Sequence, residues 1–176
     1  MYMSDVTIDL AKNETKIHTT ASEPWKITLV DTGLETMTGS RLKRVKKYIG
    51  NQTFLLTYGD GLADIDIEKL IQFHKKNKKL ATLTAIQSVG RFGALDVDAE
   101  DKVSSFLEKP KGEGGWINGG FFVLDPKVLN YIDNDDTVAW EKEPLEKLSR
   151  QGELCAYKHT GFWGCMDTLR DKISFE

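Results

Sequence analysis

Short apolar runs alternate along this chain with segments of helical periodicity, and this alternation limits the fold more than any other feature. The runs Phe54–Tyr58, Leu80–Ile86 and Phe121–Leu124 are apolar or rich in strand-forming residues, and Phe54–Tyr58 has the pattern of a strand buried on both faces. Between the first two runs, Asp66–Asn77 carries apolar residues at the spacing of a helix that covers a sheet. The pattern predicts an α/β fold with a mixed, largely parallel sheet covered by helices.

Other segments fit the same fold. The sequence predicts strands at Val6–Leu10, Trp25–Val30 and Glu153–His159, a hairpin of Gly93–Val97 with Val103–Leu107, and helices at Ser40–Ile49, Pro126–Ile132, Pro144–Gln151 and Met166–Ser174. Because no Pro/Gly-rich linker interrupts the chain, residues 1–176 are expected to form a single domain.

Composition excludes several classes of protein. The 24 basic residues are outnumbered by 27 acidic ones, which argues against a nucleic-acid-binding protein. No apolar run approaches the roughly 20 residues of a membrane span, and the first residues lack the features of a signal peptide. Cys155 and Cys165 form no disulfide framework and no zinc spacing. These observations predict a cytoplasmic protein with no membrane or nucleic-acid partner.

Two acidic residues are candidates for metal binding. In Tyr58-Gly59-Asp60-Gly61, a carboxylate follows a strand at the edge of the sheet where ligands bind in open α/β folds. Such a carboxylate can hold Mg²⁺, although a tight turn also explains Gly-Asp-Gly. Asp167 follows a glycine- and aromatic-containing turn, and taken alone it is better explained as the cap or first-turn acid of the last helix. The functional hypothesis requires Asp60 and Asp167 to converge on one metal ion.

Two polar motifs lie at the ends of predicted strands, one at the close of a strand and the other at the start of the next. Glu108-Lys109-Pro110 ends a strand, and Lys109 could contact a phosphate or sugar hydroxyls; a solvated turn is the alternative. In Asn118-Gly119-Gly120, the glycines could leave room for a ligand and the Asn118 amide offers both a donor and an acceptor. A β-bulge or tight turn is the alternative for this motif.

A further motif opens a predicted helix. The backbone N–H groups of Thr38-Gly39-Ser40-Arg41, together with the Arg41 side chain, could bind an anion, and the alternative is an ordinary Ser or Thr cap. His74 lies on the apolar row of its helix and is predicted to be a structural histidine, either packed or partly exposed.

The motifs recur in a specific order over nearly the whole chain. They are Val30-Asp-Thr-Gly33, Met37-Thr-Gly-Ser-Arg-Leu-Lys-Arg44, Thr57-Tyr-Gly-Asp-Gly61, Arg91-Phe-Gly-Ala-Leu-Asp96, Phe106-Leu-Glu-Lys-Pro-Lys111, Ile117-Asn-Gly-Gly-Phe-Phe-Val123, Trp140-Glu-Lys-Glu-Pro-Leu145, and Gly161-Phe-Trp163 with Met166-Asp-Thr-Leu-Arg170. The series resembles the sugar-phosphate nucleotidyltransferase family and, within it, the members that transfer a cytidylyl group.

The resemblance implies a Rossmann-like core that joins CTP and α-D-glucose 1-phosphate into CDP-glucose and pyrophosphate. It also implies Mg²⁺ as cofactor, a homo-oligomeric assembly and a place in nucleotide-sugar biosynthesis for lipopolysaccharide O-antigen. By similarity, the catalytic residues are Asp60, Asp167 and Lys109, with Asp60 and Asp167 as metal ligands. The implied nucleotide-binding residues are Thr38, Gly39, Arg41 and Gly59, and the implied sugar-phosphate-binding residues are Glu108, Lys109, Asn118 and Gly119.

The chain also departs from the family pattern. Nothing like Gly-Gly-x-Gly-Thr-Arg-Leu, the phosphate-gripping loop of the family, occurs in the 176 residues. We therefore expect a domain that is incomplete at its N-terminus and has little or no activity alone. In addition, Ser40 stands where the family usually has Gly, and Gly164-Cys165 replaces a more usual pair before Met166.

Two other functions remain open from the sequence. One is the transfer of a uridylyl or thymidylyl group to the same sugar phosphate, because base choice depends on the nucleotide pocket. The other is a non-catalytic domain that binds a sugar phosphate. A plain structural α/β domain explains the ordered motifs least well.

Overall fold

A computed structural model describes residues 5–18, 24–87, 94–97, 102–107 and 115–176 of the chain. These residues belong to two compact units, residues 1–31 and residues 32–176, each of which is described by itself. The single domain expected from the sequence stays a prediction.

The first unit contains a two-stranded hairpin. β1 (Val6–Asp9) pairs antiparallel with β2 (Glu14–Ile17), with Val6 opposite Ile17. The described residues 24–31 form neither helix nor strand, so the predicted strand at Trp25–Val30 is wrong. Trp25 is 74% exposed and Ile27 69% exposed. An alternating pattern produces a half-buried strand only where one face is covered, and here neither face is.

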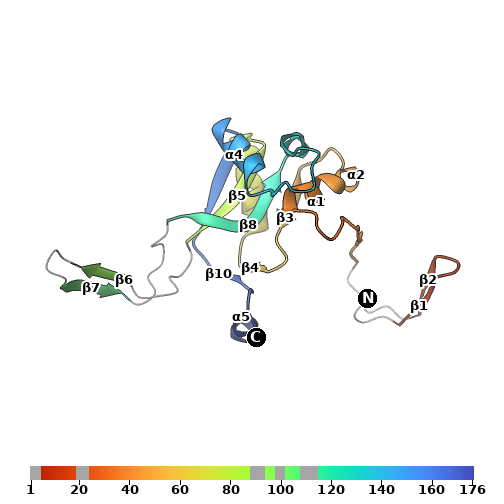
Figure 1. Cartoon of the computed structure of the whole chain (residues 1–176), viewed down its shortest axis with the longest axis horizontal. Coiled ribbons are helices and arrows are strands. Elements are labelled where there is room, and N and C mark those ends of the chain that lie inside the picture. The colour runs from red at the N-terminus through yellow and green to blue at the C-terminus, as the bar shows by residue number, and fades with distance from the viewer. Residues whose placement is uncertain (1–4, 19–23, 88–93, 98–101, 108–114) are drawn as a thin grey trace. The chain divides into compact units, whose positions relative to one another are not determined.

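The second unit is built around a four-stranded sheet with the order β3-β8-β5-β9, of which β3, β8 and β5 are labelled in Figure 1. The strands are β3 (Phe54–Thr57), β8 (Ile117–Leu124), β5 (Ala81–Ile86) and β9 (Leu154–His159). β8 runs antiparallel to both β3 and β5, and β9 runs parallel to β5. The mixed sheet is confirmed, with β3, β5 and β9 running in the same direction. Their carboxyl ends therefore share one edge with the start of β8.

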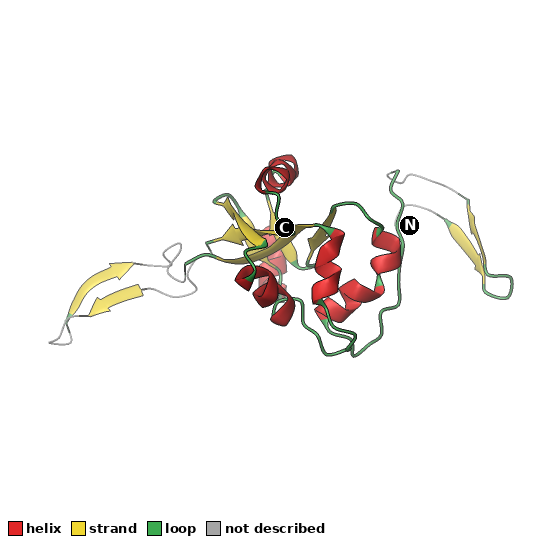
Figure 2. Ribbon diagram, turned by 90° about the horizontal axis from the view of Figure 1, so that it is seen from above, coloured by secondary structure: helices red, strands yellow, loops and turns green. Residues whose placement is uncertain are grey.

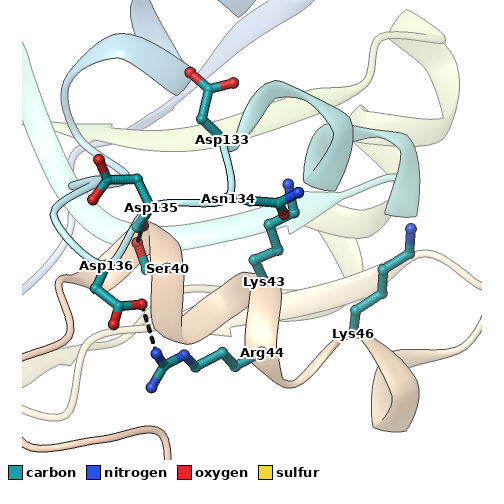
Figure 3. Close-up of a pocket in the computed structure, with 8 residues that line it drawn as sticks. All are labelled: Ser40, Lys43, Arg44, Lys46, Asp133, Asn134, Asp135 and Asp136. Atoms are coloured by element: carbon teal, nitrogen blue, oxygen red, sulfur yellow. Dashed lines mark hydrogen bonds and ion pairs between the residues drawn. The ribbon is translucent and has the colours of Figure 1, made fainter.

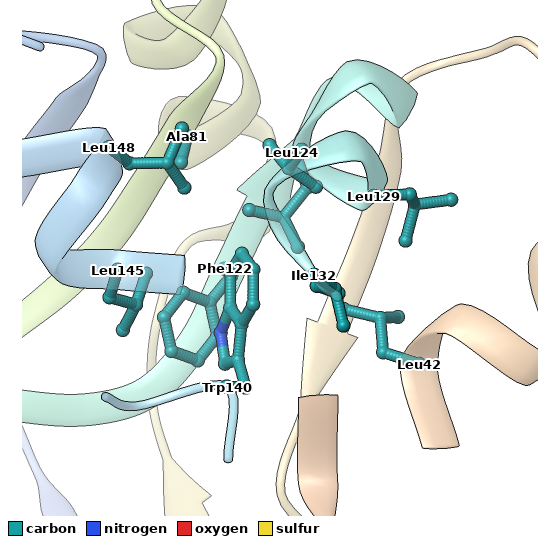
Figure 4. Close-up of a cluster of buried hydrophobic side chains, with 10 residues drawn as sticks. Leu42, Ala81, Phe122, Leu124, Leu129, Ile132, Trp140, Leu145 and Leu148 are labelled. Atoms are coloured by element: carbon teal, nitrogen blue, oxygen red, sulfur yellow. The ribbon is translucent and has the colours of Figure 1, made fainter. Parts of the chain in front are cut away.

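Helices pack on both faces of this sheet because the side chains of β8 alternate between two apolar clusters. Phe122 and Leu124 join a cluster with Leu42 from α1 (Thr38–Arg44), Leu145 and Leu148 from α4 (Glu143–Arg150), and residues of the 3₁₀ helix η1 (Pro126–Tyr131). In this cluster the rings of Phe122 and Trp140 lie edge to face, 6.0 Å apart (Figure 4).

The opposite face is covered by α3 (Ile67–Asn77), one of the helices drawn in red in Figure 2. Leu70 of α3 packs with Val123 of β8. His74 of the same helix is buried, and its Nδ1 lies 2.9 Å from the Thr82 hydroxyl. The prediction of a packed structural histidine is confirmed, and so is the α3 helix itself.

Two other predictions need correction. β3 lies at the edge of the described sheet and Leu55 is 51% exposed, so this strand is not buried on both faces. Its apolar sequence does not reveal its position in the sheet. The predicted helix at Ser40–Ile49 divides at Val45 into α1 and α2 (Lys46–Ile49).

The remaining elements are short. β6 (Ala94–Val97) and β7 (Val103–Leu107) form the predicted antiparallel hairpin. β4 (Gly61–Ala63) and β10 (Trp163–Cys165) form an antiparallel ladder that the sequence pattern does not reveal. α5 (Leu169–Phe175) begins later than predicted. Within the described residues, every helix is too short or too polar to cross a membrane.

Candidate functional site

The ladder between β4 and β10 brings two distant acidic residues together at the sheet edge. Cys165 lies opposite Gly61, and the N–H of Met166 donates to the carbonyl oxygen of Asp60 at 2.8 Å. As a result, Asp60, Cys165 and Asp167 each offer a ligand atom, and these atoms all lie within 4.8 Å of one another. The structure thus brings together the two aspartates that the metal hypothesis requires, and it adds Cys165, which sequence reasoning had not assigned to the site.

The alternative explanation of Asp167 as a helix cap does not hold. The cap of α5 is Thr168, whose side chain accepts the N–H of Asp171 while the Asp171 carboxylate accepts the N–H of Thr168. The Asp167 carboxylate accepts instead from the Cys165 thiol, at 3.1 Å. Asp167 is therefore placed beside Asp60 rather than used to start the helix.

The cluster is chemically suited to a divalent cation. Carboxylate oxygens are the ligands that hard cations prefer, and a bound cation offsets the repulsion between two like charges. The negative surroundings raise the pKa of the Cys165 thiol to about 11, chiefly through its hydrogen bond to Asp167, then through burial and the charge of Asp60. A side chain added at Gly59 would meet open space, so the approach to Asp60 is not crowded there.

A second set of polar contacts joins three elements around Glu141. Thr38, the first residue of α1, donates to Glu141 Oε2 at 2.7 Å, and the Tyr58 hydroxyl donates to Glu141 Oε1 at 2.6 Å. Asn118 of β8 donates to the same hydroxyl at 3.3 Å. The pKa of Tyr58 is raised, first by burial and then by the bond to Glu141, so the phenol keeps its proton.

Sequence reasoning had given no role to Glu141 or Tyr58, although both lie in motifs that carried the family resemblance. The one available signal was the position of Glu141 in Trp140-Glu-Lys-Glu-Pro. The contacts link Thr38, predicted to bind nucleotide, to Asn118, predicted to bind the sugar phosphate.

A mainly apolar cavity of about 270 Å³ lies next to these contacts, lined by Thr32, Thr38, Arg41, Leu42, Val45, Leu56, Thr57, Tyr58 and Trp140. Arg41 lines it with its guanidinium held in place, because Nη1 donates to the Thr32 hydroxyl and Nη2 to the Leu34 carbonyl, each at 2.8 Å. The cavity places the predicted nucleotide residues Thr38 and Arg41 on one wall.

The N–H of Ser40 at the start of α1 is bound within the protein. It donates to the Val138 carbonyl at 3.2 Å, and the Ser40 hydroxyl donates to the Asp135 carbonyl. A Cβ at Gly39 would lie 2.9 Å from the Val138 oxygen. Gly39 and Ser40 therefore serve close packing against the loop before Trp140, and the anion site predicted at Thr38-Gly39-Ser40-Arg41 stays a prediction.

The Asn118-Gly119-Gly120 motif forms a bulge in β8. The pairing with β5 shifts between Leu83 and Ala85, which lie opposite Phe122 and Asn118. Asn118 Oδ1 accepts the N–H of Gly120, whose φ of +78° favours glycine. Added Cβ atoms would lie 2.9 Å from Ile86 at Gly119 and 2.7 Å from Tyr58 at Gly120. A side chain at either position would therefore meet protein atoms, so both glycines are needed for close packing, and the predicted contact of Asn118 and Gly119 with the sugar phosphate stays a prediction.

Two of the predicted site residues, Glu108 and Lys109, lie outside the described residues. Their roles stay predictions.

A separate cavity of about 440 Å³ is lined by Ser40, Lys43, Arg44, Lys46 and residues 133–136 (Figure 3). Arg44 pairs there with Asp136 at 2.6 Å, and Lys43 donates to the Ile132 carbonyl. Of the described residues that were predicted to be catalytic or to bind substrate or metal, only Ser40 of the predicted anion motif lines this cavity. Because Arg44 and Lys43 bind protein atoms there, we assign the cavity no ligand.

The chain is similar to known proteins over most of its length. The family model described as nucleotidyl transferase matches residues 12–165. The chain is 58% identical to glucose-1-phosphate cytidylyltransferase of Salmonella typhi, over 100% of this chain and 68% of that protein. It is 46% identical to the probable glucose-1-phosphate cytidylyltransferase of Bacillus subtilis, over 86% of this chain and 59% of that protein.

Among solved structures, HddC from Yersinia pseudotuberculosis matches with a TM-score of 0.56 and 26% identity, over 79% of this chain and 60% of that one. The chain thus spans about two thirds of the length of its Salmonella relative and less of the others. The match of the family model and the identity to the Salmonella protein lead to the same assignment: the chain belongs to the nucleotidyl transferase family.

Proposed function

We propose that the chain acts in cytidylyl transfer from CTP to α-D-glucose 1-phosphate, with CDP-glucose and pyrophosphate as products. The observation that carries this proposal is the convergence of Asp60 and Asp167 at the sheet edge. The 58% identity to a glucose-1-phosphate cytidylyltransferase over the whole chain supports the choice of substrates.

In the proposed reaction a phosphate oxygen of glucose 1-phosphate attacks the α-phosphorus of CTP. The bond from that phosphorus to the oxygen bridging the α- and β-phosphates breaks, and pyrophosphate leaves. Asp60 and Asp167 would hold Mg²⁺, which would supply positive charge to the phosphates during transfer. Catalysis of this kind depends on positioning and on charge neutralisation.

The remaining predicted residues are proposed to bind the two substrates. Thr38 and Arg41 line the cavity beside Tyr58 and are proposed to contact the nucleotide, with Gly59 beside the open approach to Asp60. Asn118, at the start of β8, is proposed to contact the sugar phosphate, together with Gly119, Glu108 and Lys109. Lys109 would add a positive charge near the transferring phosphate.

Base choice and catalysis are tested together in a hybrid protein. This chain would replace the matching region of the Salmonella typhi relative, so that the hybrid has the full length of that relative. Pyrophosphate release is measured with glucose 1-phosphate and CTP, UTP or dTTP. We expect CTP to give the highest kcat/KM.

A preference for UTP or dTTP would replace the proposed reaction with uridylyl or thymidylyl transfer. A folded hybrid that binds glucose 1-phosphate but turns over no nucleotide would support a non-catalytic sugar-phosphate-binding domain. The 176-residue chain itself is expected to turn over far more slowly than the hybrid, because its sequence lacks the Gly-rich phosphate-binding loop. Equal rates for the two would contradict that expectation.

Three further attributes belong to the same proposal. We infer a cytoplasmic enzyme, since CTP is a cytoplasmic metabolite. We also infer a homo-oligomer and a role in nucleotide-sugar biosynthesis for lipopolysaccharide O-antigen, both from the family resemblance. Size-exclusion chromatography with light scattering on the hybrid tests the oligomeric state.

A further inference from the structure

A polar contact joins the segment that leaves β4 to the segment that leads into β10, at the end of the ladder remote from the two carboxylates. Asp64 directly follows β4, and its Oδ1 lies 2.9 Å from Nε2 of His159, the last residue of β9. The same nitrogen lies 3.0 Å from the carbonyl oxygen of Phe162. Because both partners are acceptors, Nε2 carries the hydrogen. The His159 side chain is only 10% exposed, so its ring is largely buried.

The turn from His159 to Phe162 is shaped around this contact. The N–H of Asp64 donates to the Phe162 carbonyl at 3.2 Å, which adds a backbone bond beside the side-chain pair. A Cβ at Gly161 would collide with the Asp64 carboxylate and would lie 2.8 Å from Cε1 of His159. Gly161 is therefore required because the Asp64–His159 pair occupies the space next to it.

The ladder that this contact adjoins is short. It has three residue pairs, from Trp163 opposite Ala63 to Cys165 opposite Gly61. Two short strands are marginally stable by themselves, so their register depends on what fixes their ends. At the far end of the ladder, the bond from Met166 to Asp60 leads directly to Asp167. Asp64 and His159 fix the near end.

We propose that Asp64 and His159 are positioning residues that hold β10 in register on β4 and thereby set the distance between the carboxylates of Asp60 and Asp167. The inference rests on the proposed metal role of these two aspartates. In this arrangement neither Asp64 nor His159 is a ligand of the cation. Both act on the cation site only by holding the β4–β10 ladder in register.

The test measures the affinity of the 176-residue chain for Mn²⁺ by the electron paramagnetic resonance signal of the free ion. Asp64→Ala is the main variant, because the Asp64 side chain is 62% exposed and its loss leaves no cavity. The matched control is Asp136→Asn, which removes the ion pair of a different aspartate, that with Arg44, away from the site. Asp60→Asn reports on the metal ligands themselves.

We expect Asp64→Ala to raise the Kd for Mn²⁺ about tenfold or more, as loss of residues that orient metal ligands does elsewhere. His159→Phe should have a similar effect, and His159→Gln, which keeps an N–H donor at the position of Nε2, should restore much of the affinity. The double variant Asp64→Ala/His159→Phe should bind no more weakly than His159→Phe alone, since that variant already removes the contact with Asp64.

The possible results separate the two claims. If Asp60→Asn abolishes Mn²⁺ binding while Asp64→Ala binds like Asp136→Asn, the positioning inference is overturned and the metal site stands. If Asp60→Asn binds Mn²⁺ like the unmodified chain, the metal site of the proposed function fails, and the inference fails with it. If His159→Phe does not fold, as judged by circular dichroism, the comparison of Asp64→Ala with Asp136→Asn decides.

Discussion

Met166 and Asp60 are joined by a 2.8 Å hydrogen bond from the N–H of one to the carbonyl oxygen of the other. Through this backbone contact, the residue after β10 is fixed to the residue before β4, and Asp167 is brought beside Asp60. The separation of the carboxylates therefore depends on a three-pair ladder rather than on the large sheet. This dependence makes the site open to specific tests.

The Cys165 thiol reports on the charge of the site. Replacing Asp167 by Asn removes the main cause of the raised Cys165 pKa, so that pKa should fall toward its ordinary value. Below its pKa, a thiol gains tenfold in reactive thiolate for each unit by which the pKa falls. Alkylation by iodoacetamide at pH 8 should therefore become several-fold faster. It is measured in a Cys155→Ser background, which leaves one thiol.

Asp60→Asn should accelerate this alkylation less, because the charge of Asp60 raises the Cys165 pKa less than the bond to Asp167 does. Asp136→Asn serves as the control and should leave the rate unchanged. Equal rates for Asp167→Asn and the control would show that the thiol and the Asp167 carboxylate do not interact in solution.

Substitution by alanine is predicted to destabilise the fold more at Gly120 than at Gly152, although both glycines have a positive φ. Gly120 has φ of +78° and a Tyr58 ring atom 2.7 Å from an added Cβ, whereas Gly152 has φ of +67° and nothing within 4 Å. Gly152→Ala should cost about 1 kcal/mol from backbone strain alone. Gly120→Ala should cost about 1–3 kcal/mol more, because Tyr58 must move. Urea unfolding of both variants gives the comparison, and equal costs would contradict the close contact.

The elements that can be predicted from the sequence are those that local pattern and long-range packing both favour. The α3 helix was predicted because Ile67, Leu70 and Ile71 repeat at helical spacing, and β8 was predicted from its continuous apolar run. At Trp25–Val30 the pattern was present but no partner strand covers it. Propensity alone therefore gave a wrong strand there.

The site was harder to derive from local pattern. β4 and β10 have three residues each, one of which is a glycine in each strand, and neither has a sequence pattern typical of a strand. The convergence of Asp60 and Asp167 was expected only because the ordered motifs resembled a family. Cys165 and Glu141 were not assigned to the site, since their partners are distant in sequence: Cys165 is placed by Gly61, and Glu141 binds Thr38 and Tyr58.

His74 should make the stability of the fold depend on pH. Burial lowers the His74 pKa, opposed by the negative charge of Asp125. In the unfolded chain a histidine titrates near its ordinary value of about 6.5, so below that pH the unfolded state binds more protons than the folded state. The free energy of unfolding should therefore decrease as pH falls below about 6.5 and level off once His74 is protonated in the folded state.

Urea unfolding between pH 5 and pH 8 measures this dependence. A His74→Gln variant keeps an amide that can reach Thr82 but has no titrating group, so its free energy of unfolding should change less over the same range. The same slope in both proteins would exclude His74 as the cause.

The rate of CDP-glucose formation by the hybrid protein is the most direct test of the central claim, that Asp60 and Asp167 form one metal-binding centre for cytidylyl transfer. It is measured with CTP, glucose 1-phosphate and Mg²⁺ for the unmodified hybrid and its Asp60→Asn, Asp167→Asn and Asp136→Asn variants. We predict that kcat falls about 100-fold or more in each of the first two variants. The double variant should lose little beyond either one, and Asp136→Asn should be unaffected. Turnover in Asp167→Asn equal to that of Asp136→Asn would contradict the account.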